Sequence, residues 1–169
     1  MMMLDRDATL ADTAALVGLF EQVFDETFAH LYRPEDLQAF LEEHGAELWR
    51  EQLQDPSFAI HVVEEAGLLA GYSKLGPLRL PVEPRAPAIE LSQLYVAKAW
   101  HGSSVGRTLM DWTIAEARRR GARELYLSVY TDNPRARRFY GRYGFEEVGP
   151  YKFMVGEQAD DDIILRLDL

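Results

Sequence analysis

The fold is decided by residues 89–130, which read IELSQLYVAKAWHGSSVGRTLMDWTIAEARRRGARELYLSVY. Aliphatic and aromatic residues predict a strand at each end, over residues 89–96 and 125–130. Between these strands, apolar residues recur at helical spacing over residues 105–120, and Gly121 marks the end of that helix. A strand, a helix and a strand in this order favour two parallel neighbours joined by a right-handed crossover.

Further helices and strands are predicted on both sides of this unit. They are helices at 9–31, 34–45, 47–54 and 134–143, a hairpin of 58–64 with 68–75, and strands at 145–148 and 163–167. Residues 1–8 lack the alternation of a strand, because Asp5, Arg6 and Asp7 are all charged. The sequence therefore predicts an α/β fold of mixed α+β type in one domain, residues 1–169. Its central mixed β-sheet has six to seven strands, with helices on both faces.

Composition excludes several classes of protein. The chain has 169 residues, no cysteine and a formal net charge of −10. This length is sufficient to bury a core without disulfides, and the lack of cysteine excludes thiolate chemistry. The acidic balance argues against sequence-independent nucleic-acid binding and suits a cationic small molecule. No apolar run approaches the roughly 18 residues of a membrane span, so we expect a soluble, cytoplasmic protein. Its expected oligomeric state is a monomer or a homodimer.

A loop rich in small residues follows the first strand of this unit. Residues 100–108 read WHGSSVGRT, and exposed amides at a helix N-terminus form an anion site suited to phosphate. An ordinary tight connection would look the same. Residues 102–106 also fit G-x-S-x-G, which would make Ser104 the nucleophile of a hydrolase. That pattern requires a later histidine, but all four histidines precede Ser104: His30, His44, His61 and His101. Their spacing predicts no metal site.

A second motif, residues 132–145, reads DNPRARRFYGRYGF. An Asn that opens a helix, a Phe-Tyr pair and a Gly-Phe pair resemble the signature of the GNAT superfamily of N-acetyltransferases. The loop at 101–106 is similar to the acetyl-CoA pyrophosphate loop of that family. Gly106 fits its pattern, whereas His101 replaces the usual basic or amide residue and Ser104 replaces the first of its paired small residues. The resemblance extends over residues 9–169. Segments 24–28, 90–96 and 153–156 look like the PaiA-like branch of polyamine acetyltransferases.

The resemblance implies a GNAT-like sheet, acetyl-CoA as cofactor and direct attack by an amine. Tyr140 would protonate the leaving sulfur, although a helix aromatic packed on the sheet fits the same pattern. Glu90 would remove the proton of the amine, since strand parity places it with Ser92, Leu94 and Val96 on one face. A solvated outward carboxylate is the alternative for Glu90. If position 104 needs a positive φ, its serine would weaken cofactor binding by about 1 kcal/mol.

The resemblance also assigns binding residues. The implied cofactor-binding residues are Leu94, Tyr95, Val96, His101, Gly102, Ser103, Ser104, Val105, Gly106, Arg107, Thr108, Asn133, Tyr140 and Arg142. Arg142 is assigned to the ribose 3′-phosphate. The implied acceptor pocket is formed by Asp25, Glu26, Phe28, Glu90 and the proline-containing loop 76–87. The acidic run 160–162 would attract a polyamine, but a short acidic turn between strands is the more ordinary interpretation.

The acceptor expected from this resemblance is the primary amine of a small molecule, with a polyamine as the first candidate. Three other functions remain open. A non-catalytic acyl-CoA sensor would keep the cofactor site alone, and the departure at Ser104 favours it. A protein N-terminal or lysine acetyltransferase would use the same chemistry on a larger acceptor. A hydrolase using Ser104 is disfavoured by the missing histidine.

Overall fold

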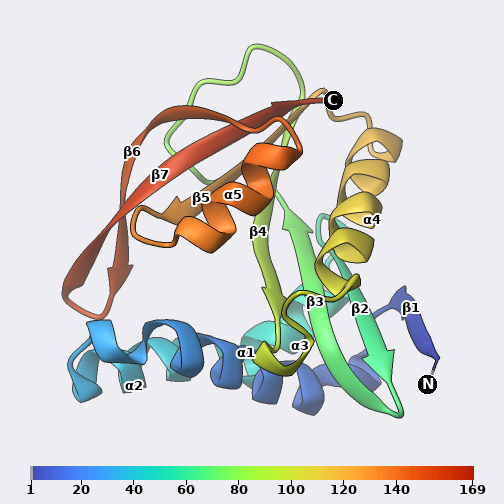
Figure 1. The fold of residues 1–169 in the computed structure, drawn as a ribbon, viewed down its shortest axis with the longest axis vertical. Helices are drawn as coiled ribbons and strands as arrows, with labels where there is room; N and C mark the ends of the chain where they lie inside the picture. The colour runs from blue at the N-terminus through green and yellow to red at the C-terminus, as the bar shows by residue number, and fades with distance from the viewer. Residues whose placement is uncertain (1) are drawn as a thin grey trace.

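The computed structural model describes residues 2–169 and contains a seven-stranded β-sheet (Figure 1). The strand order is β1-β2-β3-β4-β5-β7-β6. The strands are β1 (Met3–Asp7), β2 (Ala59–Glu65), β3 (Leu68–Gly76), β4 (Ala88–Val96), β5 (Glu124–Tyr130), β6 (Glu146–Val155) and β7 (Gln158–Asp168). β4 and β5 are parallel, and the other neighbours in the described sheet are antiparallel. The predicted mixed sheet with a parallel central pair is confirmed.

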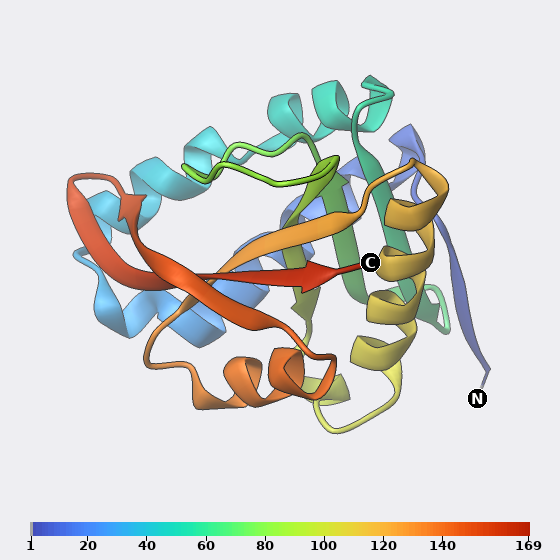
Figure 2. The ribbon, with the colours of Figure 1, turned by 90° about the horizontal axis from the view of Figure 1, so that it is seen from above.

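Helices cover both faces of this sheet (Figure 2). They are α1 (Thr13–Phe28), α2 (Pro34–Glu43), α3 (Ala46–Gln54), α4 (Val105–Arg119) and α5 (Pro134–Arg142), with short 3₁₀ turns at Leu10–Asp12, Ala29–Leu31 and Lys98–Trp100. α1, α2 and α3 pack on one face in a core that includes Val62 and Tyr72. α4 and α5 pack on the other face against Leu91, Leu125 and Leu127. No helix within residues 2–169 has the length and apolar character needed to cross a bilayer.

A strand that the sequence analysis did not predict lies at one edge of the sheet. β1 pairs with β2, and its charged side chains find partners from distant segments. Asp5 and Asp7 each contact a ring nitrogen of His61 at 2.8 Å, and Arg6 pairs with Asp12 at 2.8 Å. Edge strands tolerate charged residues, so the lack of alternating apolar and polar residues does not exclude a strand here. Met1, at the start of the same segment, lies outside the described residues.

The last two strands are longer than predicted, and they carry a buried acidic pair. β6 and β7 form a hairpin that continues well beyond the expected strand ends at 148 and 163. Residues 160–162 lie inside β7, so their interpretation as a turn is wrong. Asp160 and Asp162 are buried, whereas Asp161 is exposed. The Tyr32 hydroxyl donates a hydrogen bond to the Asp160 carboxylate. This contact, made by a residue 128 positions earlier, compensates part of the cost of burying an acidic strand.

Lys74 on β3 is a buried cation beneath α3. Its side chain is 3% exposed, and its Nζ donates to Gln52 Oε1 at 2.7 Å while lying 3.8 Å from the centroid of the Trp49 ring. Burial, with a smaller contribution from Arg79, lowers the pKa of Lys74 to about 7. The folded protein therefore loses this proton at a lower pH than the unfolded chain does.

Because folded Lys74 loses its proton at a lower pH, the protein should become more stable as the pH rises. Above about pH 7 the unfolded chain keeps a proton that folded Lys74 has released, so the free energy of unfolding increases. Between about pH 7 and about pH 9, the wild type should gain about 2 kcal/mol relative to a Lys74→Met variant. Urea unfolding at the two pH values measures this difference. Equal pH slopes in the two proteins would contradict the assignment.

Candidate active site

A pocket of about 1130 Å³ lies where β4 and β5 separate. The two strands pair through residues 88–90 and 124–126, and beyond these positions both strands line the pocket. A bulge in β4 explains part of this divergence. Lys74 faces Gln93 and Leu75 faces Leu91, which leaves Ser92 as the extra residue. A bulge bends its strand and increases the local twist. The parallel pair therefore opens at the carboxyl ends of its strands.

The first turn of α4 forms one wall of this pocket. Gly102 takes a φ of +79°, but Ser104, the N-cap residue of α4, has a φ of −79°. The serine is therefore unstrained, and the expected weakening of the loop by a positive φ is wrong. Gly106 and Arg107 line the pocket, and amides in the first turn of a helix have no intrahelical partner. Together with the helix dipole, these amides favour an anion at this wall.

Most of the predicted loop residues lie at the pocket, but two do not. His101, Gly102, Ser103, Ser104, Gly106 and Arg107 line it. Val105 is instead buried in a small core against β3, and the Thr108 amide bonds to the Ser104 carbonyl at 2.9 Å. Both residues stabilise the start of α4 and do not line the pocket. The Ser104 side chain makes no hydrogen bond to a histidine among the described residues, as a hydrolase would require.

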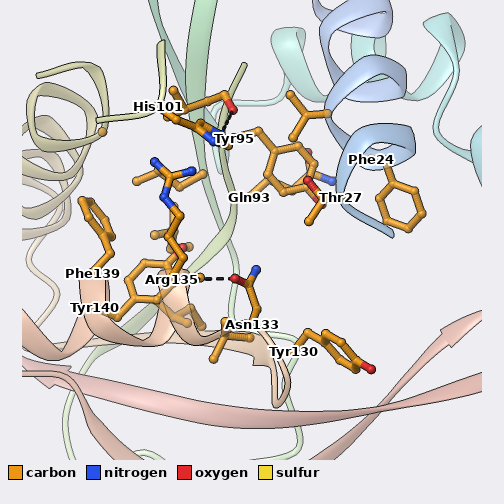
Figure 3. A pocket seen from close by; sticks show the side chains of 18 of the residues that line it. Phe24, Thr27, Gln93, Tyr95, His101, Tyr130, Asn133, Arg135, Phe139 and Tyr140 are labelled. Carbon is orange, nitrogen blue, oxygen red and sulfur yellow. Dashed lines mark hydrogen bonds between the residues drawn. The ribbon is translucent and has the colours of Figure 1, made fainter. Parts of the chain in front are cut away.

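The positive charge near this wall comes from arginines and from Lys98. His101 Nε2 lies 3.0 Å from the Val96 carbonyl, and burial lowers the pKa of His101, which keeps its ring neutral at neutral pH. Arg107, Arg135 and Arg142 all line the pocket. Figure 3 shows the Arg135 side chain extending toward His101. Three arginines and the start of α4 thus make this end of the pocket suitable for phosphate groups.

α5 brings Tyr140 to the pocket as predicted. Asn133 also lines the pocket, and its Oδ1 accepts a hydrogen bond from the Ala136 amide at 3.2 Å, which caps α5. Tyr140 is 9% exposed and packs edge-on against Phe139 and Phe145, with ring centroids 5.4 and 5.6 Å away. Burial raises the pKa of Tyr140 above its ordinary value, so its phenol stays protonated. Leu94, Tyr95 and Val96 of β4 lie across from it, as Figure 3 shows for Tyr95.

The opposite end of the pocket is aromatic and acidic. Phe28 of α1 lies there as predicted, whereas Asp25 is exposed and lies outside the pocket. Glu26 lines the pocket as predicted, but it lies close enough to His101 for its charge to act on that ring. The loop 76–87 lies outside the pocket as well, because the apolar side chains of this loop pack against Tyr126 and Ile164. Six residues of this end were not assigned to the site from the sequence: Phe24, Thr27, Tyr32, Ser128, Tyr130 and Phe153. Asp160 and Asp162, from the acidic run that would attract a polyamine, also line this end.

Glu90 does not lie at the pocket, which removes the basis for its assignment as a base. Its Oε1 accepts hydrogen bonds from the amides of Arg79 and Leu80 at 2.9 and 3.0 Å, which anchors the loop 76–87. Glu90 faces Tyr126, where β4 and β5 are still paired. The bulge at Ser92 breaks the strand parity from which its position was predicted.

A Glu90→Ala variant tests this reassignment. Removing the carboxylate leaves two loop amides without their acceptor, so the free energy of unfolding should fall by about 1 kcal/mol. Turnover should stay within about twofold of the wild type, whereas loss of a general base would lower it by about 100-fold or more. Thermal unfolding and steady-state kinetics on the same preparation separate the two roles. A large loss of turnover at unchanged stability would restore Glu90 as the base.

Comparisons with known proteins agree with this geometry. The model of the acetyltransferase (GNAT) family matches residues 24–145. An uncharacterized N-acetyltransferase of Mycobacterium tuberculosis H37Rv is 27% identical over 161 residues, covering 95% of this chain and 99% of the relative. The PaiA N-acetyltransferase of Thermoplasma acidophilum, solved with coenzyme A, has a TM-score of 0.82 at 18% identity, with 100% of both chains covered. YncA of Salmonella typhimurium, solved with acetyl-CoA, has a TM-score of 0.75 at 26% identity, covering 99% of this chain and 94% of the other.

Proposed function

We propose, from the premise that this chain belongs to the acetyltransferase (GNAT) family, that it transfers the acetyl group of acetyl-CoA to a small primary amine. One observation carries the proposal. A continuous pocket passes between β4 and β5, with an anion-binding wall at one end and an aromatic, acidic wall at the other. The two ends suit a phosphate-bearing cofactor and a cationic acceptor, which would meet beside β4.

The residues at the first end fit acetyl-CoA. The first-turn amides of α4, with Arg107 and Arg135, would hold the pyrophosphate, and Arg142 is the proposed partner of the ribose 3′-phosphate. The backbone of residues 94–96 lines the opening between the strands, where it would hold the pantetheine arm. The unstrained Ser104 removes the sequence-based argument for a disabled loop.

The chemistry of transfer follows from the groups beside β4. Acetyl-CoA supplies a thioester whose acetyl carbon can be attacked by a neutral amine. Backbone N–H groups near Val96 would donate to the acetyl oxygen in the buried opening, where such hydrogen bonds are strong. The Tyr140 phenol holds a proton that it would donate to the sulfur, since burial keeps it protonated at neutral pH.

Within small amines, a linear polyamine or diamine is our first choice. Asp160 and Asp162 line the acceptor end, and their carboxylates suit an acceptor with more than one ammonium group. A peptide N-terminus would carry a single ammonium group followed by a peptide chain. Such an acceptor would gain less binding free energy from a second carboxylate.

Thiol release from acetyl-CoA tests the proposal. The acceptors are a linear diamine, a monoamine of equal length, a peptide with a free N-terminus and a neutral diol. We expect thiol release with the amines and not with the diol, with the diamine as the most efficient acceptor. Saturable binding of acetyl-CoA without thiol release in any arm would favour a sensor. Release with the peptide alone would favour a protein acetyltransferase.

A further inference from the structure

Two buried carboxylates project into the acceptor end of the pocket. Asp160 and Asp162 on β7 are each 8% exposed and line the pocket, whereas Asp161 between them is exposed and pairs with Lys152. Alternation along a strand places Asp160 and Asp162 on one face and Asp161 on the other. We call Asp160 and Asp162 the acidic pair.

The two members of the acidic pair have different partners. The Tyr32 hydroxyl donates to Asp160 Oδ2, so Asp160 is fixed by a neutral donor. Asp162 accepts no hydrogen bond of ordinary geometry from residues 2–169, although the Ser128 hydroxyl is near enough to favour its charged form. Within the same residues, neither carboxylate forms an ion pair with a lysine or an arginine. An acidic pair without a cation is an unfavourable arrangement in a buried site.

The groups that act on the charge of Asp162 include no cation. Asp160 and Asp161 repel it, and Ser128 is its one neutral donor. Burial raises the pKa of Tyr32 and of Tyr130, and the charges of Asp160 and Asp162 raise both further. These groups come from the turn after α1, from β5 and from β7. A bound ammonium group would supply the missing positive charge.

The acidic pair also lies within reach of the transfer site. Burial raises the pKa of Tyr95, and the nearby Tyr140 and Asp162 raise it further. Tyr95 on β4 therefore lies near both the proposed sulfur-protonating group and Asp162, and all three residues line the pocket. The ring of Phe28 packs edge-on against Tyr130, with the two ring centroids 6.2 Å apart. Phe28 thus adds an aromatic surface for the methylene chain of an alkylammonium.

We propose that the acidic pair selects a cationic acceptor, with Asp160 holding the ammonium group and Asp162 removing its proton. This inference rests on the proposed acetyltransferase function and assigns the base that Glu90 does not provide. Burial, with the repulsion of Asp160, raises the pKa of Asp162 to about 7, which suits a general base at neutral pH.

The protons balance across the reaction. Asp162 takes one proton from the ammonium, and the neutral amine attacks the acetyl carbon. The C–N bond forms, the C–S bond breaks, and Tyr140 gives its proton to the leaving sulfur. The second proton of the nitrogen then restores the Tyr140 phenol through solvent, and Asp162 returns its proton to solvent. One proton therefore ends on the thiol and one in solution.

Neutral variants of the pair test this assignment, with Asp161→Asn as the matched control. With a linear diamine as acceptor, Asp162→Asn should lower kcat by about 100-fold or more and remove the inflection near pH 7 from the pH profile of kcat/KM, which reports the free enzyme. Its residual rate should keep rising with pH, because the free fraction of the amine then limits turnover. Asp160→Asn should raise KM for the diamine by about 10-fold or more, with a smaller effect on kcat. Asp161→Asn should match the wild type.

A binding measurement separates this inference from the proposed function. In a calorimetric titration with coenzyme A present, the diamine should bind the wild type about 10-fold or more tightly than either variant of the pair. If the wild type turned over no amine, the proposed function would fail, and this titration would still decide the role of the pair. Unchanged diamine affinity, or an Asp162→Asn enzyme with wild-type kcat and pH profile, would overturn the inference.

Stability provides a readout that does not depend on turnover. A carboxyl whose pKa is raised on folding destabilises the protein as pH rises from about 4 through about 7. Asp162→Asn should therefore melt at a higher temperature than the wild type above neutral pH. A lower melting temperature would mean that Asp162 stabilises the fold, in contradiction to its assignment as an uncompensated base.

Discussion

A Tyr140→Phe enzyme is expected to lose about 100-fold or more in kcat while its affinity for acetyl-CoA stays within about twofold. The phenol hydroxyl is the group placed to protonate the sulfur, and the burial that raises its pKa keeps the proton available. Phenylalanine keeps the edge-on packing against Phe139 and Phe145, so the pocket retains its shape. Steady-state kinetics with the best amine acceptor and calorimetric titration of acetyl-CoA measure the two quantities.

The matched control for Tyr140 is Tyr151→Phe. Tyr151 lies on β6 outside the pocket, packed near Tyr126 and Ile164, so removal of its hydroxyl should leave kcat unchanged. A Tyr140→Phe enzyme with wild-type kcat would show that Tyr140 is a packing residue. In that case the proton of the sulfur must come from solvent or from another side chain.

A Ser104→Asp variant should bind acetyl-CoA about 100-fold more weakly without losing stability. A carboxylate about 5 Å from a phosphate charge, at an effective dielectric constant of about 20, opposes it by about 3 kcal/mol. The same substitution should preserve the fold, because Asp is as good an N-cap as Ser and its charge suits the helix dipole. Ser104 is the N-cap of α4 and lines the pocket.

Ser104→Asn separates charge from size at this position. Asn is also a good N-cap and has nearly the same shape as Asp, but it carries no charge. We expect its acetyl-CoA affinity to lie close to that of the wild type and its melting temperature to match that of the Asp variant within a few degrees. Equal affinities of the Asp and Asn variants for acetyl-CoA would mean that the phosphates bind elsewhere.

The part of the fold that could be predicted depends on local signals. The helix after the glycine-containing loop begins at Val105 and ends before Gly121, as its spacing and stop residue indicate. Pro134 likewise opens α5, and the motif that follows brings Tyr140 to the pocket. Such signals lie within a few residues of the element they define. The family resemblance and the anion-binding wall rest on them.

The errors arise where distant residues decide the outcome. β1 forms because His61 and Asp12 satisfy its charges. The bulge at Ser92 has no signature in the sequence, and it reverses the strand parity that placed Glu90 in the site. The buried position of Asp160 depends on Tyr32. In each case, tertiary packing determines which face of a strand a polar residue occupies.

Calorimetric titration with acetyl-CoA and with dephospho-CoA tests the central claim most directly. The claim is that the pocket between β4 and β5 is an acetyl-CoA site with its phosphates at the start of α4. It predicts saturable micromolar binding of acetyl-CoA, with a binding free energy of about −8 kcal/mol. It also predicts weaker binding of dephospho-CoA, because that ligand lacks the phosphate that an arginine would contact. No binding of either ligand to the folded protein would contradict the claim.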